Sequence, residues 1–464
     1  MDQWVRDLLE TERKKRNIPL EAKLLNGNYY LYRSTSRFDR PSRKIRKVTE
    51  YIGRMTPSGV VERSKSVRTV FEYGNSELIM AVSGSMLNLL KKHFPQSWND
   101  IFALAVTRLL SPVPLRSAKE LWDKLYMSRE MDAHISPNSI TDLLRSIGGD
   151  LDAQDSLYED LMGASEKLAF DLSSIFSQSE NVMMAAKGHN SDHVYLKQVN
   201  MALLFDVERY SPVYLKPVEG SVRDVKSLRK LLETIGFSGI LVLDRGFTSD
   251  DLAHIMDARM RFVMPLRRNQ EHADYSIRLV SSFVYRKRGI LCGFSSSGDY
   301  RVYMFHDPVL AGEEASTFIH MISEGKRKQE DYEDESRKFG KIAVMSNVND
   351  HPEKIYLMYK MREEIEQAFD AMKNEMENDK SYLSGDESLT GYFFISFVSL
   401  YLYYSLFSLI RAADLTSRYS VKDVLLRFSK VYRIAGGKKE INSEIPSSVE
   451  KLDQAFGTHI FPKI

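Results

Sequence analysis

The sequence predicts an α/β protein built around a mixed β-sheet. Beyond residue 166 the apolar pattern changes to strand-like runs, at 167–176, 194–208, 210–219 and 239–246. The last run, GILVLDRG, is apolar until it meets an acid, which is typical of a strand buried on both faces. Amphipathic helices are predicted after the third and fourth strands, at 224–236 and 249–259. This order predicts three antiparallel strands and then a helical crossover to a parallel strand.

The N-terminal part predicts a β-hairpin followed by helices. Residues 28–33 and 46–52 are predicted as strands on either side of a basic, proline-containing turn. From 76 to 165 apolar residues recur at three- and four-residue spacing, which is typical of amphipathic helices, and the prolines of 111–115 interrupt them.

The C-terminal half predicts an insertion and two long helices. Short strand-like runs fill 262–345, a helix is predicted over 352–376, and an apolar helix covers 391–410. A chain of 464 residues is expected to form several domains. The expected division is an N-terminal hairpin module (1–75), a helical region (76–165), a core (166–261 and 346–415), a β-rich insertion (262–345) and a C-terminal region (416–464).

Cysteine usage and the N-terminal sequence bear on the compartment. Cys292 is the single cysteine, which excludes an internal disulfide and any zinc site built from several cysteines. The first 16 residues are charged throughout and contain no apolar segment of the kind that directs secretion. We therefore expect a reducing, cytoplasmic environment.

Charge is distributed unevenly along the chain. Residues 11–70 contain 16 Lys and Arg against 5 Asp and Glu, a local balance of +11. Because the whole chain carries +2, the remaining residues carry −9. A basic segment on a mildly acidic body indicates a module that binds a polyanion. A solvated basic surface is an equally good interpretation of the charge alone.

The apolar stretch 391–410 is long enough to span a bilayer. It contains four Ser and four Tyr, occurs once, and lacks the flanking Lys and Arg pattern of membrane helices. A helix buried in a large core explains it better than a membrane span. A membrane protein remains an alternative that rests on this stretch alone.

Two acids lie at strand positions of the predicted sheet. Asp171 is in the first strand and Asp244 ends the fourth. Ligand sites form at strand ends in open α/β sheets, and divalent metal ions such as Mg²⁺ prefer carboxylate oxygens. Two acids in strands have a structural or solvent-facing role at least as often as they bind a metal ion.

The helix predicted over 352–376 carries four polar residues on one line. Tyr359, Arg362, Glu366 and Lys373 fall within a sector of about 60° at 100° per residue, beside an apolar stripe. An ordinary amphipathic helix with ion pairs at its margin is the simpler interpretation. A carboxylate flanked by Arg and Lys also suits a site where metal ions and DNA phosphates meet.

These residues resemble those of the insertion-sequence DDE transposases of the IS-four superfamily that carry a Y-R-E-K signature. FDLSSI at 170–175 matches the first acid, LVLDRGF at 241–247 the second, and IYLMYKMREEIEQAFDAMK at 355–373 the third. GHNSDHVYLKQV (188–199) and EGSVRDVKSL (219–228) resemble loops of the family. The likeness covers roughly 165–412 well and 28–55 loosely.

The resemblance implies a fold, a reaction and its residues. The fold would be ribonuclease-H-like, and 76–165 would be a helical DNA-binding region. Asp171, Asp244 and Glu366 would be the catalytic triad and would converge to hold two Mg²⁺ ions about 4 Å apart, with Mn²⁺ as a substitute. Other residues would contact double-stranded DNA: Tyr359, Arg362, Lys373, Arg245, Arg40, Arg43, Lys44, Arg46 and Lys47. The protein would cut transposon ends and join them to target DNA as a nucleoid-associated prokaryotic homodimer without a membrane.

The chain departs from the family pattern at three points. The first acid is followed by Leu172 where relatives have a D-T-T-like run, and Glu363 stands where many relatives have Trp. Related transposases stack a Trp of the insertion on a flipped base, but all Trp residues here precede the insertion. Tyr285 or Tyr303 would have to replace it, since any aromatic face can stack on a base.

Other chemistries lack their motifs. The sequence contains none of the common nucleotide-binding, zinc-protease or serine-hydrolase motifs. His189 and His193 are four residues apart in a polar loop, where a metal site is the weaker interpretation. Two rivals to an active transposase stay open: a transposase-derived DNA-binding protein that no longer cuts, and a ribonuclease-H-like nuclease without strand transfer.

Overall fold

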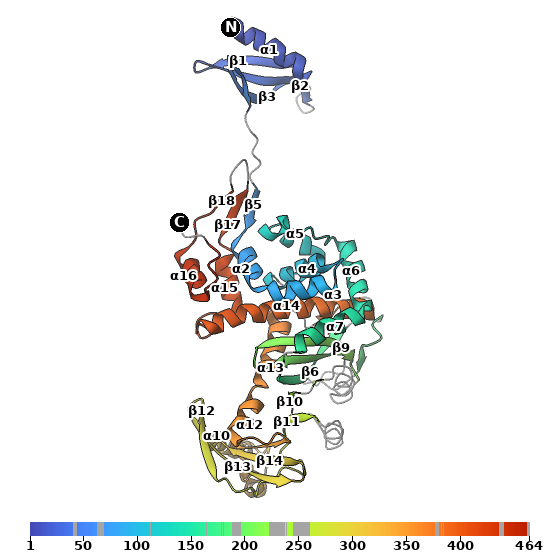
Figure 1. Ribbon diagram of the computed structural model, residues 1–464, viewed down its shortest axis with the longest axis vertical. Coiled ribbons are helices and arrows are strands. Elements are labelled where there is room, and N and C mark those ends of the chain that lie inside the picture. The colour runs from blue at the N-terminus through green and yellow to red at the C-terminus, as the bar shows by residue number, and fades with distance from the viewer. Residues whose placement is uncertain are drawn as a thin grey trace. The chain divides into compact units, whose positions relative to one another are not determined.

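The chain folds into two compact units in a computed structural model (Figure 1). One unit comprises Met1–Thr69 and Ile434–Ile441, and the other Val70–Arg433 and Asn442–Ile464. The structure describes residues 1–39, 44–62, 69–111, 113–163, 165–177, 179, 181–187, 196–221, 237, 239–244, 260–375, 380–381, 383, 385–435 and 440–461. The predicted helices 224–236 and 249–259, and the pair His189 and His193, lie outside these residues.

The N-terminal unit is a helix packed on a four-stranded antiparallel sheet. Helix α1 (Gln3–Arg16) ends at Asn17, whose φ of 51° is left-handed. The sheet has the order β1-β2-β3-β4, with bounds Leu20–Leu25, Asn28–Asp39, Lys44–Thr56 and Gly59–Glu62. The two predicted strands are confirmed: 28–33 is the first half of β2, and 46–52 lies within β3. The core of this unit contains Val5, Leu9, Leu20, Leu31 and Met55.

The helical region predicted over 76–165 is confirmed. It contains α2 (Gly74–Val82), α3 (Gly84–His93), α4 (Trp98–Leu110), η1 (Leu115–Ser117), α5 (Ala118–Trp122), η2 (Tyr126–Arg129), α6 (Pro137–Gly149) and α7 (Leu151–Met162). Helices α2 and α3 are interrupted at Ser83. The buried hydroxyl of Ser83 donates to the carbonyl of Ile79 at 2.5 Å. A side-chain bond of this kind competes with the helical backbone and bends it.

Helix α14 (Asp386–Ala412) contains the apolar stretch and lies at the centre of the second unit (Figure 1). Every residue from Ser388 to Leu400 is buried, and the helix packs on α4, α6 and β9. Among the helices that the structure describes, α14 alone is by itself long and apolar enough to cross a membrane. However, 67% of its most apolar 18-residue window is buried inside this chain. The interpretation as a core helix agrees with this burial.

Two glycines allow α6 and α14 to approach closely. A Cβ at Gly148 would lie 1.8 Å from the Glu387 carbonyl oxygen, and one at Gly391 would lie 2.0 Å from the Leu144 carbonyl oxygen. Neither backbone can yield without separating the helices. Gly149 follows Gly148 in the same helix, yet a Cβ there would meet nothing within 4 Å.

We therefore expect Gly148→Ala to lower the free energy of unfolding by about 3 kcal/mol, because overpacking a rigid contact is destabilising. Gly149→Ala is the matched control and should leave stability unchanged or slightly raised, since alanine favours helix. Thermal unfolding followed by circular dichroism compares the two. Equal melting temperatures for both variants would contradict the close approach.

The second unit contains a large mixed sheet. Strands β6 (Lys167–Ser177), β8 (Lys197–Asp206) and β9 (Ser211–Glu219) are antiparallel neighbours. Strand β10 (Ile240–Val242) pairs parallel with β6, and β11 (Arg261–Pro265) pairs parallel with β10. The predicted order of three antiparallel strands and a parallel crossover strand is confirmed. Short strands β7 (Ala186–Lys187) and β16 (Lys380–Ser381) pair with β8 and β6.

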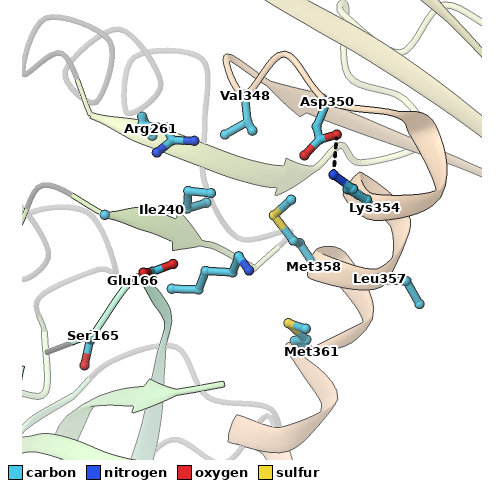
Figure 2. A pocket seen from close by; sticks show the side chains of 12 residues that line it. Ser165, Glu166, Ile240, Arg261, Val348, Asp350, Lys354, Leu357, Met358 and Met361 are labelled. Carbon is cyan, nitrogen blue, oxygen red and sulfur yellow. Dashed lines mark ion pairs between the residues drawn. The ribbon is translucent and has the colours of Figure 1, made fainter. Parts of the chain in front are cut away.

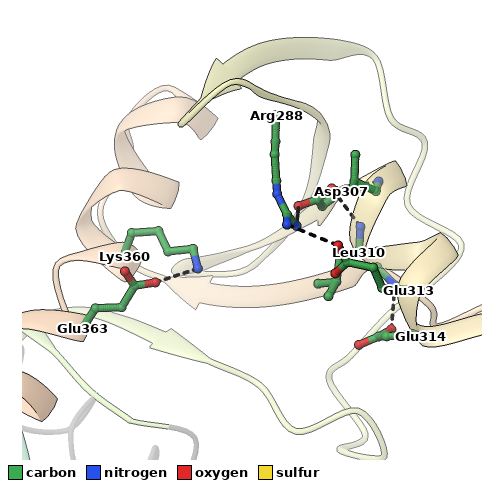
Figure 3. A network of polar contacts seen from close by, with 9 residues as sticks. Arg288, Asp307, Leu310, Glu313, Glu314, Lys360 and Glu363 are labelled. Atoms are coloured by element: carbon green, nitrogen blue, oxygen red, sulfur yellow. Dashed lines mark hydrogen bonds and ion pairs between the residues drawn. The ribbon is translucent and has the colours of Figure 1, made fainter. Parts of the chain in front are cut away.

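The β-rich insertion extends this same sheet. Its β15 pairs antiparallel with β11, and the order continues through β14 and β13 to β12. The bounds are β12 Ser281–Tyr285, β13 Arg288–Ser297, β14 Tyr300–His306, α10 Pro308–Ser323, η3 Gln329–Asp331, α11 Tyr332–Ser336 and β15 Lys341–Ser346. Asp307 accepts the backbone amides of Val309 and Leu310 at the start of α10, and also pairs with Arg288 (Figure 3).

The prediction of a single helix over 352–376 is wrong. The segment forms α12 (Pro352–Lys360), α13 (Glu363–Asp370) and a π-helical turn (Ala371–Glu375). At the junction the amide of Arg362 donates to the carbonyl of Tyr359, three residues back, instead of four. A tightened turn within a helix often marks a functional position.

The remaining elements are β5 and a group near the C-terminal end of the sequence. A three-stranded sheet has the order β18-β17-β5. The bounds of these strands and of the last helices are β5 Thr69–Glu72, α15 Val421–Phe428, β17 Tyr432–Ala435, β18 Ile441–Asn442 and α16 Ser447–Phe456.

Candidate active site

The register of β6 and β10 brings the first two acids to one level of the sheet. Val242 of β10 is opposite Ala169 of β6, and the two strands are parallel. Asp244 follows Val242 by two residues, as Asp171 follows Ala169. Side chains two residues apart point to the same face of a strand. Both acids therefore lie at the carboxyl end of β10, where sites form in such sheets.

Helix α13, which packs on β6 and β8, brings the third acid to the same place. The guanidinium of Arg362 lies 2.5 Å from Asp244 Oδ1 and 2.9 Å from Glu366 Oε1. The side chain of Arg362 is 17% exposed, that of Asp244 33% and that of Glu366 51%. One partly buried cation thus joins a strand end to a helix 118 residues later in the chain.

The charges around Arg362 include all three acids. Burial alone would lower the pKa of Arg362. The charges of Asp244, Glu366, Tyr359 and Asp171 act against burial, and together they raise this pKa. The acids that the sequence singled out therefore act together on one guanidinium.

The expected metal cage is not preformed. Among the described residues, no group of three His, Cys, Asp or Glu side chains is arranged to hold a metal ion. Arg362 takes the position of the counter-cation between Asp244 and Glu366. The donor set itself fits a hard divalent ion, because it consists of carboxylates that are partly open to solvent.

The polar line predicted on one helix is not continuous, because the helix breaks at Arg362. Tyr359 is 5% exposed, and its ring packs 6.1 Å from that of Tyr356. Lys373 lies in the π-helical turn, whose wider geometry departs from 100° per residue. Tyr359 nevertheless acts on Arg362, whose pKa it raises, and contact of Tyr359 and Lys373 with DNA stays a prediction. Arg245 lies outside the described residues.

The insertion contacts α13 beside this site. Arg286 Nη1 lies 3.1 Å from Glu363 Oε2, and Lys360 Nζ lies 2.8 Å from Glu363 Oε1 (Figure 3 shows the Lys360 pair). Arg286 and Lys287 form the turn between β12 and β13 with φ angles of 46° and 66°. Such left-handed non-glycine residues occur often at functional sites.

The two candidate stacking residues differ in accessibility. Tyr303 is fully buried, and its hydroxyl lies 3.2 Å from the Val348 carbonyl oxygen and 3.1 Å from that of Asp350. The prediction that Tyr303 could stack on a base is therefore wrong. Tyr285 is partly exposed beside the Arg286 turn, with burial raising its pKa.

A cavity of about 700 Å³ lies at the opposite end of the parallel strands (Figure 2). It is lined by the first residues of β6, β10 and β11, namely Lys167, Ile240 and Arg261, and by α12. Asp350 and Lys354 pair at its rim, 3.3 Å apart. The cavity is separated from the acids by the length of the strands and has no part in their chemistry.

The predicted N-terminal contacts are only partly described. Lys47 is 61% exposed and pairs with Glu21. Arg40 and Arg43 lie outside the described residues, as do the side chains of Lys44 and Arg46. Their contact with DNA stays a prediction.

About half of the chain matches a known family of domains. Residues 168–402 match the family model described as a transposase DDE domain. This match covers just over half of the chain, so the chain belongs to the transposase DDE domain family. No curated protein matches the chain. A solved structure titled as the piggyBac transposase synaptic complex with hairpin DNA is similar at a TM-score of 0.39 and 10% identity, over 79% of this chain and 77% of that one.

Proposed function

We propose that the chain is a cut-and-paste DDE transposase of the IS-four superfamily, from the group with the Y-R-E-K signature. Asp171, Asp244 and Glu366 are its catalytic and metal-binding residues. The observation that supports this most strongly is that Arg362 pairs with both Asp244 and Glu366, while the register of β6 and β10 sets Asp171 level with Asp244, within a transposase DDE domain. The strand order β9-β8-β6-β10-β11 supports a ribonuclease-H-like core.

The proposed cofactor is a pair of Mg²⁺ ions, with Mn²⁺ as a substitute. When bound, such ions activate the attacking oxygen and stabilise charge on the phosphate in phosphodiester exchange. The three carboxylates hold the ions in place. We expect Arg362 and Lys373 to neutralise phosphates of the DNA backbone. Tyr359 is buried, so we propose that it supports Arg362 from the core.

Arg362 changes partners in this proposal. Without metal it neutralises Asp244 and Glu366. With metal ions held by these carboxylates, the guanidinium would be available to a phosphate of the transposon end. Metal binding and DNA binding would then favour each other, because each removes a competitor of the other.

Arg362→Gln is therefore expected to bind Mn²⁺ about tenfold more tightly in the absence of DNA, because it removes charge-assisted bonds worth roughly 1.5–3 kcal/mol. Isothermal titration of the full-length protein measures this affinity. Arg288→Gln is the control, because Arg288 pairs with Asp307 and Glu313, away from the triad. A weaker or unchanged Mn²⁺ affinity in Arg362→Gln would contradict the exchange of partners.

The proposed partners are double-stranded transposon ends and target DNA, bound by a homodimer. We place the protein at the prokaryotic nucleoid in the cytoplasm and propose no membrane contact. The test incubates the purified protein with Mg²⁺ and a DNA fragment that carries the inverted repeats flanking its own gene. Cleavage at the repeat ends followed by joining to a target plasmid is expected.

Other outcomes of this test would replace the proposal. Hydrolysis without joining would indicate a nuclease that does not transfer strands. Specific binding of the repeats without cleavage would indicate a transposase-derived DNA-binding protein. The absence of both binding and cleavage would refute a role at these ends.

A further inference from the structure

The sheet of the N-terminal unit has one face that carries tyrosines and cations. Helix α1 covers the other face, where Trp4 packs edge-on against Tyr29 at 5.8 Å. On the open face, the antiparallel register aligns Lys23 with Tyr30 and Tyr30 with Arg54. Residues opposite each other on antiparallel strands lie on the same face.

A β-bulge completes this face. The register shifts between Leu31 and Tyr32, so that Tyr32 is opposite Tyr51 although Tyr30 is opposite Arg54. Without the shift, Tyr51 would lie on the helix side, since it is three residues from Arg54. Bulges often re-aim a side chain in this way. The result is a cluster in which the ring centroids of Tyr30 and Tyr32 are 5.9 and 5.5 Å from that of Tyr51.

The tyrosine cluster remains partly open to solvent. Its rings are tilted by 59° and 63° to one another, so they do not cover each other's faces. Nζ of Lys23 lies 4.6 Å above the ring of Tyr32. No described helix of this unit packs on this side of the sheet. Aromatic faces beside exposed cations are the elements that bind unpaired nucleic acid.

The charge of the unit favours a polyanion over a protein partner. Residues 1–69 contain 17 Lys and Arg against 8 Asp and Glu. Two of the cations on the open face, Lys23 and Lys47, are held by Glu21, which lies 3.1 Å from Lys23 Nζ. Glu21 therefore competes with phosphates for these lysines. A second copy of the chain would bring like charge to the same face and is disfavoured.

We propose that this face binds unpaired DNA, with bases stacked on Tyr30, Tyr32 and Tyr51 and phosphates bound by Lys23 and Arg54. The choice of DNA rests on the proposed function, in which the substrate that is cut is DNA. The contact is distinct from the basic turn of the β2–β3 hairpin. It assigns this unit a role in holding a strand rather than in reading duplex sequence.

The test measures binding of a fluorescent oligothymidylate and of a blunt duplex by anisotropy, with the full-length protein. Tyr51→Ala is expected to weaken single-strand binding by roughly 5- to 100-fold, which corresponds to the loss of one stacked base. Tyr51→Phe keeps the ring and should retain wild-type affinity. Tyr432→Ala, at a tyrosine that is 43% exposed outside the cluster, is the control.

A second variant acts in the opposite direction. Glu21→Gln is expected to tighten single-strand binding and steepen its salt dependence, because it frees Lys23 and Lys47 for phosphates. Unchanged single-strand affinity in Tyr51→Ala, or an equal loss for the duplex, would overturn the proposal. These outcomes are distinguishable from failure of the proposed function, because binding to this face requires neither metal nor the triad.

Discussion

Replacing Asp244 with asparagine is expected to abolish DNA cleavage while binding to the transposon end remains. Asparagine keeps the shape of the side chain and can still accept a bond from Arg362, but it removes the charge that a metal ligand needs. Metal ions contribute several kcal/mol to phosphodiester exchange, so we expect a loss of roughly a thousandfold or more. Phosphate contacts by cations elsewhere on the protein are not affected by this change.

The measurement compares Mg²⁺-dependent cleavage and gel-shift affinity on the same end fragment. Asp350→Asn is the matched control, because Asp350 lies at the cavity on the opposite end of the parallel strands. It should cleave like the wild type. Cleavage by Asp244→Asn at a rate close to that of wild type would remove Asp244 from the triad, and with it the proposed mechanism.

Deleting residues 1–68 is expected to cause the second large effect, on the salt dependence of end binding. The segment contains 17 Lys and Arg. If about five of them contact phosphates, the slope of log affinity against log salt falls by about 4 to 5. Between about 50 and 200 mM salt, this corresponds to a roughly 500-fold change in affinity that the truncated protein would no longer show.

The truncated protein should still fold, because the two units have separate hydrophobic cores. A control for general loss of positive charge replaces Lys326, Arg327 and Lys328, which are exposed in the other unit, with glutamine. Gel-shift titrations over a salt series compare the three proteins. Parallel salt slopes for the full-length and truncated proteins would show that the basic segment is a solvated surface.

Some features of this protein could be predicted from local sequence alone. Apolar residues predicted the strand around Asp171 and the buried helix over 391–410, because a helix that is apolar all round is buried in the core. The order of strands then limited the topology to a few choices. Acids at strand positions pointed to the site before any contact was known.

Other features depended on contacts between distant residues. Apolar periodicity predicted one helix over 352–376, but Arg362 binds Asp244 across 118 residues and lies at the junction between α12 and α13. The strands of the insertion join the core sheet through β11, which their own pattern does not indicate. Tyr303 and Tyr285 were equally good candidates for stacking on a base, yet the surrounding strands bury Tyr303.

The physical reason is the range over which each kind of information acts. Periodicity and turn residues determined which side of each segment faces inward. They therefore also determined which elements form, the order of these elements, and which acids lie on the sheet. Packing decided which of these segments meet, since burial and ion pairing stabilise contacts that no local pattern encodes. Only the tertiary structure placed Arg362 among three carboxylates, and only the bulge in β2 and β3 placed Tyr51 beside Tyr32.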